Sequence, residues 1–332
     1  MNIALIGAGR IGRIHAAAIA DHPQARLAAV ADAIPEAARA LAERHASRVL
    51  SVDEICAAQG IEAVLIASST ATHADCLARA ARAGKAVLCE KPIALDIERT
   101  RAALAVLAAH PVIFALGFNR RHDPQFAALK AGIDAGRIGR LETLTITSRD
   151  PAPPPIDYIR GSGGLFRDMM IHDFDMARWL FDEPIAHVEA AGGCLIDPAI
   201  GAAGDIDTAM VTLVTESGRL CHIQNARRAA WGYDQRLEAC GSHGLLQVQN
   251  ETPTRLRLMD ETGQREEKPL DFFLERYALA YRRELDDFVT ACREGRAPQA
   301  GAEDGLEALR LAAAAERALS ERRRVALEEI ER

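Results

Sequence analysis

The stretch NIALIGAGRIG, residues 2–12, decides the fold of the first part of the chain. A short apolar run leads directly into Gly7, Gly9 and Gly12, which match the pattern G-x-G-x-x-G. The pattern binds a dinucleotide when it follows a strand and opens a helix, as it does here. Glycines permit a tight turn, and the N–H groups of the first helical turn point at the pyrophosphate. The stretch therefore predicts a dinucleotide-binding unit.

A carboxylate ends the second apolar run, LAAVAD, at Asp32. Asp32 follows Gly12 by about 20 residues, the spacing of an acid that binds the adenosine ribose. A glycine turn followed by a chance acid is the alternative, and the agreement of strand, turn, helix, strand and acid argues against it. Because a carboxylate would repel a 2′-phosphate, and because Ala33 rather than an arginine follows, the sequence predicts NAD rather than NADP.

The distribution of strands divides the chain into two parts. Up to about residue 118, continuous apolar runs alternate with alanine-rich helical stretches, which predicts a parallel sheet covered by helices. Beyond residue 120 the strands alternate between apolar and polar residues, with a hairpin near Ser217–Gly218 and with TRLRLMDETG, residues 254–263, continuing the series. We expect helices at 163–181, 272–294 and 301–319, and a proline-rich loop at 150–159.

These patterns predict an α/β protein of two domains. The first is a Rossmann dinucleotide-binding domain at residues 1–118. The second, at residues 119–332, is an α+β domain with an open, mainly antiparallel sheet. Residues 207–228 carry apolar side chains on both faces of a strand, with Ala209, Val211 and Leu213 on one face and Met210, Thr212 and Val214 on the other. One face must meet helices, so we expect the other to pair with a second subunit in a dimer.

Composition excludes several classes of partner. The 332 residues are 49% hydrophobic and carry a net charge of −7, which disfavours binding to nucleic acid or anionic membranes. No apolar run approaches the length of a membrane span, and the opening strand leaves no room for a signal peptide. Seven scattered cysteines without a CxxC pair indicate reduced thiols in the cytoplasm. The ten histidines form no metal-binding spacing, so no metal site is expected.

The strand KAVLCEK places Lys91 at the edge of the parallel sheet where ligands bind. Pro92 ends the strand immediately afterwards. Ser68, Ser69 and His73 follow the preceding strand and can reach the nicotinamide side. A solvated lysine at a strand end is the alternative interpretation of Lys91.

The segment GGLFRDMMIHDFDMARW, residues 163–179, has two opposed stripes when it is drawn as a helix. One stripe is apolar and consists of Phe166, Met170, Phe174, Ala177 and Phe181. The other carries Asp168, His172 and Asp175. The polar stripe is either a solvated surface or a catalytic face. The preceding pair Gly163–Gly164, together with Lys91 and the dinucleotide motif, favours the catalytic interpretation.

Together, GAGRIG, CEKP and the Gly163–Trp179 segment resemble the Gfo/Idh/MocA oxidoreductases. Four further segments are similar to the inositol-oxidising subgroup of that family: SRDPAPPP, CLIDPAIGAAGDIDTAMVTL, GYDQRLEACGSHG and FFLERYALAYRRELDDFV. The resemblance covers essentially the whole chain. It implies a Rossmann domain and a C-terminal sheet domain that binds substrate and carries the oligomer interface, through which a family member can form a tetramer. It also implies hydride transfer between NAD and a polyol or sugar carbon.

The resemblance also implies roles for individual residues. Lys91, Asp168 and His172 form the expected catalytic group, with His172 as general base, Asp168 orienting it and Lys91 stabilising charge on the substrate oxygen. The expected reaction oxidises myo-inositol to 2-keto-myo-inositol. The alternatives are another inositol isomer or an aldose as the substrate, or a non-catalytic sensor that binds NAD. Trp231 departs from the tyrosine that the resemblance leads us to expect.

Two sets of binding residues complete these expectations. The cofactor set is Gly7, Gly9, Arg10, Ile11, Gly12, Asp32, Ser68, Ser69, His73, Glu90 and Lys91. The substrate set is Lys91, Asn119, Arg120, Asp150, Asp168, His172 and Tyr233, with Arg227 as a further candidate. We expect Asp173 and Asp175 to be structural or to contact substrate rather than to be catalytic.

Overall fold

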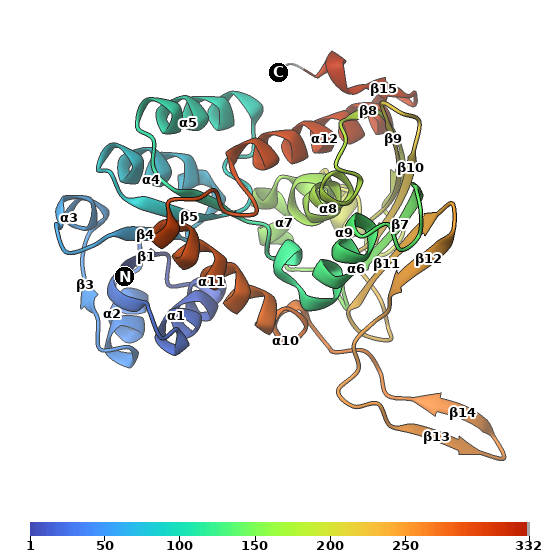
Figure 1. Ribbon diagram of the computed structural model, residues 1–332, viewed down its shortest axis with the longest axis horizontal. Coiled ribbons are helices and arrows are strands. Elements are labelled where there is room, and N and C mark those ends of the chain that lie inside the picture. The colour runs from blue at the N-terminus through green and yellow to red at the C-terminus, as the bar shows by residue number, and fades with distance from the viewer. Residues whose placement is uncertain (331–332) are drawn as a thin grey trace. The chain divides into compact units, whose positions relative to one another are not determined.

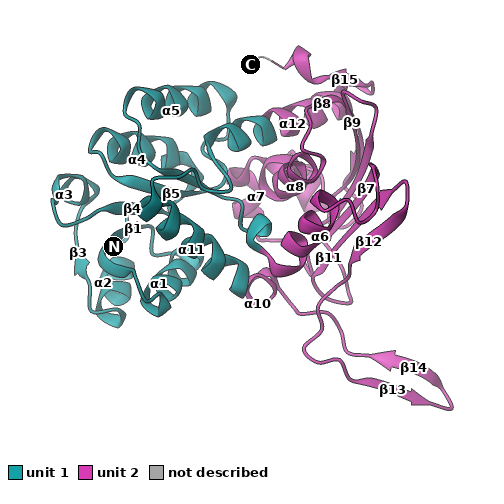
Figure 2. Cartoon of the chain, in the orientation of Figure 1, with its two compact units in different colours: residues 1–122, 279–309 teal, residues 123–278, 310–332 magenta. Residues whose placement is uncertain are grey.

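The computed structural model describes residues 1–330 of the chain (Figure 1). The chain forms two compact units (Figure 2). The first contains residues 1–122 and 279–309, and the second contains residues 123–278 and the segment that begins at residue 310. Each unit has its own sheet.

Six parallel strands form the sheet of the first unit, in the order β3-β2-β1-β4-β5-β6. The strands are β1 (Asn2–Ile6), β2 (Arg26–Ala31), β3 (Arg48–Val49), β4 (Ala63–Ile66), β5 (Ala86–Glu90) and β6 (Phe114–Gly117). The chain order reverses between β1 and β4, the point of such a sheet beyond whose carboxyl ends dinucleotides bind. The predicted parallel Rossmann sheet is confirmed.

Helices cover both faces of this sheet, as the continuous apolar strands require. They are α1 (Arg10–Asp21), α2 (Pro35–Arg44), α3 (Val52–Ala57), α4 (Thr70–Arg82), α5 (Ile97–Ala109) and α11 (Ala278–Glu294). The apolar residues Leu285, Phe288 and Val289 of α11 join one buried cluster with Ile3 and Leu5 of β1.

The position of α11 corrects two expectations. The sequence predicts one helix at residues 272–294 in the second domain, whereas α10 (Phe273–Arg276) and α11 are separate helices. Residues 279–309 belong to the first unit. Periodicity shows that a helix has an apolar face but not which sheet covers that face, so the sequence alone does not place α11 in the first unit.

Seven strands form the sheet of the second unit, in the order β12-β11-β7-β10-β9-β8-β15. They are β7 (Leu141–Arg149), β8 (Ile185–Gly193), β9 (Thr208–Thr215), β10 (Leu220–Ala226), β11 (Asp234–Gly241), β12 (Gly244–Val248) and β15 (Val325–Ala326). Only the β7–β10 pair is parallel among the pairs of this sheet, all of which lie in the described part of the chain. The hairpin β9–β10 turns at Gly218, whose φ is +87°, so both the mainly antiparallel sheet and its hairpin are confirmed.

Two local expectations in this unit were wrong. The strands β13 (Arg257–Asp260) and β14 (Gly263–Glu266) pair with one another in a separate two-stranded sheet rather than extending the main sheet. All their residues are exposed, including the apolar Leu258 and Met259. The expected loop at 150–159 gives way to the helix α7 (Ile156–Ser162), which begins directly after Pro155.

The inner face of the second sheet is held by a buried polar anchor. Asp173 of α8 (Ile171–Phe181) is fully buried and accepts hydrogen bonds from Ser148 Oγ at 2.7 Å and Asn225 Nδ2 at 2.8 Å. These bonds fix α8 on β7 and β10. The remaining helices are η1 (Asn119–His122), α6 (Pro124–Asp134), η2 (Phe166–Met170), α9 (Pro198–Ala202), α12 (Ala302–Glu321) and η3 (Leu327–Glu329).

Two further observations concern residues 1–330. No helix within this range has both the length and the hydropathy that crossing a membrane requires. All seven cysteines are free thiols.

The loop before β9 generates a prediction about acid stability. Asp207 is fully buried and accepts the backbone N–H groups of Leu195 and Ile196 at 2.8 Å and of Asp197 at 3.0 Å. Burial alone would raise the pKa of Asp207, but these N–H donors lower it to about 2. The stabilisation by the ionised carboxylate is therefore complete above the ordinary pKa of an aspartate and is lost as the pH falls toward 2.

We expect Asp207→Asn to lower the free energy of unfolding by about 2 kcal/mol at pH 7. Thermal unfolding measured between pH 7 and pH 2 should show the melting temperatures of variant and parent converging as the pH falls. Asp157→Asn, at a side chain that is 94% exposed, is the control and should not change the melting temperature. A constant difference between Asp207→Asn and the parent across this range would contradict the interpretation.

Candidate functional site

The three glycines of the first loop have different surroundings. Gly7 has a φ of +105°, and a Cβ added there would lie 2.4 Å from the carbonyl oxygen of Ala67. A Cβ on Gly12 would lie 1.9 Å from the carbonyl oxygen of Gly7. A Cβ on Gly9 would meet nothing within 4 Å. The turn and its packing thus require Gly7 and Gly12, while Gly9 leaves open space before α1 into which a pyrophosphate fits.

Asp32 is tied to this loop from the end of β2. Its Oδ2 accepts the N–H of Ala8 at 2.6 Å, and its Oδ1 accepts the N–H of Ile34 at 2.7 Å. These bonds hold a half-buried carboxylate beside the glycine turn. Arg10 and Ile11 begin α1 on the other side of the turn. The arrangement fits a dinucleotide with its pyrophosphate at the start of α1 and a ribose at Asp32.

His73 has a different role from the one expected. The imidazole is 2% exposed, with Nδ1 at 2.8 Å from the carbonyl oxygen of Pro92 and Nε2 at 3.0 Å from that of Ser68. Both ring nitrogens therefore lie against backbone carbonyls, and none is left for a cofactor. His73 joins the segment after Lys91 to the segment after β4. Ser68 Oγ pairs with Thr72 Oγ1 at 2.7 Å, and Ser69 is exposed at the start of α4.

Glu90 and Lys91 follow one another at the carboxyl end of β5. Lys91 is half-buried and stands just beyond the strand, at the edge where ligands of such sheets bind. The Glu90 carboxylate turns into the unit, where Oε1 lies 2.7 Å from Nε2 of His15 on α1. Sequence reasoning did not identify His15. Asn119 and Arg120 follow the end of β6 in η1 and are 3% and 5% exposed.

The segment expected to be one helix from residue 163 is divided. α7 ends at Ser162, Gly163 and Gly164 have φ values of +86° and +82°, and Phe166–Met170 form a π-helical turn before α8. A Cβ on Gly164 would lie 2.9 Å from Oδ1 of Asp205. The glycine pair therefore admits a carboxylate of the protein itself. Asp168 lies in the π turn, a distortion that is frequent at functional sites.

Burial decides between the two interpretations of the polar stripe. The apolar stripe is buried as predicted, from Phe166 to Phe181. Asp175 is only 1% exposed, and Asp168 and His172 are half-buried. A carboxylate on a solvated helix surface is exposed, and Asp175 is not. The polar stripe is therefore not simply a solvated surface.

Asp168 is held by two side chains from different elements. The hydroxyl of Tyr158 donates to Oδ1 at 2.8 Å, and Nη1 of Arg227 donates to Oδ2 at 3.4 Å. Arg227 is 1% exposed, and its Nη2 also donates to Asp205 at 3.3 Å. Arg227 is thus a buried cation shared by two carboxylates rather than an open substrate contact. No signal in the sequence identifies Tyr158, which follows a run of prolines.

The strand register brings three further candidates to one edge of the second sheet. Asp150 follows the end of β7, Arg227 follows the end of β10, and Tyr233 precedes β11. The Tyr233 ring is buried against Phe272 and Tyr277, with centroids 6.3 and 6.0 Å away. Trp231 is 47% exposed and lies under the Arg149 guanidinium.

Comparisons with known proteins agree with these features. The model of the "Oxidoreductase family, NAD-binding Rossmann fold" matches residues 1–118, and that of the "GFO/IDH/MocA C-terminal domain" matches residues 126–247. The expectations of a Rossmann domain and of NAD are confirmed at this level.

Named relatives align over nearly the whole chain. The inositol 2-dehydrogenase of Rhizobium meliloti is 49% identical over 97% of this chain and 98% of that protein, and the myo-inositol 2-dehydrogenase of Thermotoga maritima is 44% identical over 99% of each. A crystal structure of a myo-inositol dehydrogenase from Corynebacterium glutamicum superposes with a TM-score of 0.95 at 44% identity, covering 98% of both chains. That of the Lactobacillus casei scyllo-inositol dehydrogenase with NAD(H) and scyllo-inositol has a TM-score of 0.92 at 31% identity, covering 99% of both. This chain belongs to the Gfo/Idh/MocA oxidoreductase family.

Proposed function

We propose that the protein oxidises myo-inositol at C2 to 2-keto-myo-inositol, with NAD as hydride acceptor, in the catabolism of inositol. The observation that carries the proposal is the near full-length similarity to proteins named for that reaction, at 49% and 44% identity. scyllo-Inositol is the second choice, because the scyllo-inositol 2-dehydrogenase of Bacillus subtilis is 34% identical. A panel of inositols and aldoses mixed with protein and NAD, read by NADH absorbance, tests the choice.

The residues around the glycine loop are suited to hold NAD. Gly9 and the start of α1 would receive the pyrophosphate, and Asp32 would accept hydrogen bonds from the adenosine ribose. When bound, NAD supplies a nicotinamide ring that accepts a hydride. A sensor that binds NAD without turnover would show NAD binding and no NADH formation with any polyol.

Three side chains would handle the substrate hydroxyl. His172 takes its proton as general base. Asp168, itself held by Tyr158 and Arg227, supports the imidazole as the imidazole becomes charged. Lys91 donates a hydrogen bond to the same oxygen and stabilises the negative charge that develops there. Asn119, Arg120, Asp150 and Tyr233 remain candidates for the other hydroxyl groups.

The outer face of the second sheet supports a homo-oligomer. Ala209, Val211 and Leu213 of β9 are buried within the chain, whereas Met210 on the opposite face is 45% exposed. Leu220 of β10 and Leu245 of β12 share that outer face through the strand register and are 45% and 46% exposed. We propose that this face pairs with a second copy in a dimer or homotetramer, and that the protein works in the cytoplasm with its cysteines reduced.

Cofactor preference is the first test. We expect kcat/KM for NAD to exceed that for NADP, because Asp32 would face the 2′-phosphate. Asp32→Ser should narrow the ratio by removing both the hydrogen bond to NAD and the repulsion of NADP. Asp32→Asn is the variant closest in shape: it removes the charge, keeps an acceptor for the N–H of Ala8 and replaces the acceptor that the N–H of Ile34 uses by an amide donor. NADP preference in the unaltered protein would refute the assignment.

Catalytic roles are tested by three substitutions. His172→Ala should lower kcat at least ~10²-fold with NAD affinity little changed, since general bases contribute about 10²–10⁴ in rate. Lys91→Ala should also remove most activity. Asp168→Asn should lower kcat less than His172→Ala or Lys91→Ala if Asp168 only orients His172. It should lower kcat more if the charge of Asp168 stabilises the imidazolium. His110→Ala, at an exposed histidine, is the control. Near-parental turnover by His172→Ala would require another base.

Assembly is tested by light scattering at micromolar concentration. Met210→Lys combined with Leu220→Lys places two charges on the outer face of the second sheet and should shift an oligomer toward monomer. Val49→Lys adds a charge at a side chain of similar exposure, 46%, in the first unit and should leave the oligomer intact. A stable monomer of the parent protein would contradict the proposed face.

A further inference from the structure

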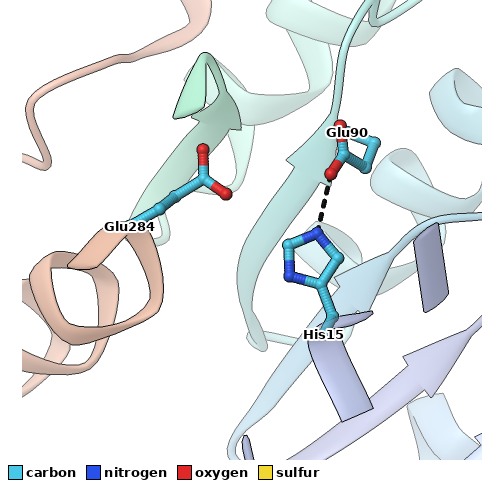
Figure 3. Close-up of side chains that lie close together, drawn as sticks. All are labelled: His15, Glu90 and Glu284. Carbon is cyan, nitrogen blue, oxygen red and sulfur yellow. Dashed lines mark hydrogen bonds and ion pairs between the residues drawn. The ribbon is translucent and has the colours of Figure 1, made fainter. Parts of the chain in front are cut away.

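Three titratable side chains meet inside the first unit (Figure 3). They are His15 of α1, Glu90 at the end of β5 and Glu284 of α11. One ligating atom from each lies within 4.8 Å of the other two. His15 is 1% exposed and Glu284 is 2% exposed. Figure 3 shows the Glu284 carboxyl group pointing toward the His15–Glu90 pair.

The hydrogen bonds of this cluster are incomplete. Nε2 of His15 lies 2.7 Å from Oε1 of Glu90. Nδ1 of His15 and both carboxyl oxygens of Glu284 are buried and have no hydrogen-bond partner. An ionised carboxylate in this state would be a buried charge without compensation, which costs several kcal/mol. One proton on Glu284 would remove that charge and provide the donor that Nδ1 needs.

The surrounding charges also disfavour ionisation of Glu284. Burial first, and then the negative charges of Glu90 and Asp287, raise its pKa well above the usual range. The titratable groups that face Glu284 are thus His15 on α1, Glu90 on β5 and Asp287 on α11 itself. In η1, His122 is kept neutral above pH 6, because burial lowers its pKa to about 4.

We propose that Glu284 is a neutral carboxylic acid that donates its proton toward Nδ1 of His15, while Nε2–H of His15 donates to Glu90. One ligating atom of each side chain lies within 4.8 Å of the others, so closing this chain of hydrogen bonds requires the Glu284 side chain to rotate toward His15. The chain acid–imidazole–carboxylate satisfies all three groups with one added proton.

This chain of bonds makes Glu284 a positioning residue for Lys91. Glu90 directly precedes Lys91, and its carboxylate is confined on a second side, where a Cβ on Gly117 would lie 2.9 Å from Oε2. Because Glu90 is held on both sides, the end of β5 has one orientation. This orientation sets the direction in which the Lys91 side chain leaves the strand. This consequence rests on the catalytic role proposed for Lys91. The protonation of Glu284 does not rest on it.

Two variants separate the proton from the packing. Glu284→Gln keeps a hydrogen-bond donor and cannot ionise. Glu284→Met has a similar length, cannot ionise and has no hydrogen-bond donor. Melting temperatures of the full chain without ligand are measured between pH 6 and pH 9. A neutral Glu284 in the folded parent releases its proton when the chain unfolds at these pH values. The equilibrium constant for unfolding of the parent should therefore rise tenfold per pH unit relative to that of Glu284→Gln. Glu294→Gln, the same change at a side chain that is 61% exposed at the end of the same helix, should show no such divergence.

Kinetics test the positioning role. We expect Glu284→Gln to keep kcat within about threefold of the parent, and Glu284→Met to lose at least tenfold in kcat while NAD affinity changes little. Parental kcat in a folded Glu284→Met variant would overturn the positioning role.

The protonation is overturned by either of two other results. A difference in melting temperature between the parent and Glu284→Gln that stays constant from pH 6 to pH 9 would show that Glu284 is ionised in the folded protein. One equivalent of divalent metal in the purified parent, absent from Glu284→Gln, would show that a cation takes the place of the proton. Inactivity of the parent on every polyol, with the pH divergence present, would refute the proposed function and support the neutral acid.

Discussion

The fold of the first unit depends on the close approach of β1, β4 and α1 at the glycine loop, residues 7–12. The chain leaves β1 at Gly7, passes against the carbonyl of Ala67 beyond β4, and returns so that Gly12 touches the carbonyl of Gly7. No side chain larger than hydrogen fits at either contact. The same closeness brings Asp32 within reach of the N–H of Ala8, so the turn and the carboxylate are fixed together. The edge of the sheet then presents the residues that follow β4 and β5.

Local patterns were enough to predict this edge. Strand, glycine turn, helix and acid are all near neighbours in sequence, and each constrains its own surroundings, so the parallel sheet, the loop and the position of Lys91 followed from the residues alone. The polar stripe of residues 168–175 was likewise identified from spacing. The π turn that interrupts the expected regular helix was not, since a π turn has no residue signature comparable to that of a glycine turn.

What the sequence did not reveal depends on pairings between distant segments. The cation between Asp168 and Asp205 comes from Arg227, about 60 residues away from Asp168, and the partner of Glu90 comes from α1. His73 looked like a ligand at a strand end and is instead enclosed by two carbonyls. The helix that begins at residue 278 has an apolar face that fits either sheet by composition, and only the fold assigns it to the first.

The π turn has a consequence for how the second unit tolerates change. Asp168 is anchored before the irregular turn ends, by Tyr158 and Arg227, while α8 is anchored after it, by the bonds of Asp173 to β7 and β10. Asp168 lies within the π turn and His172 lies in the first turn of α8, so the bonds that hold the carboxylate differ from those that hold the helix. A substitution at Tyr158 or Arg227 therefore releases Asp168 while the bonds of Asp173 still hold α8 to the sheet. Damage to the first set of bonds stays local, and the second unit keeps its architecture.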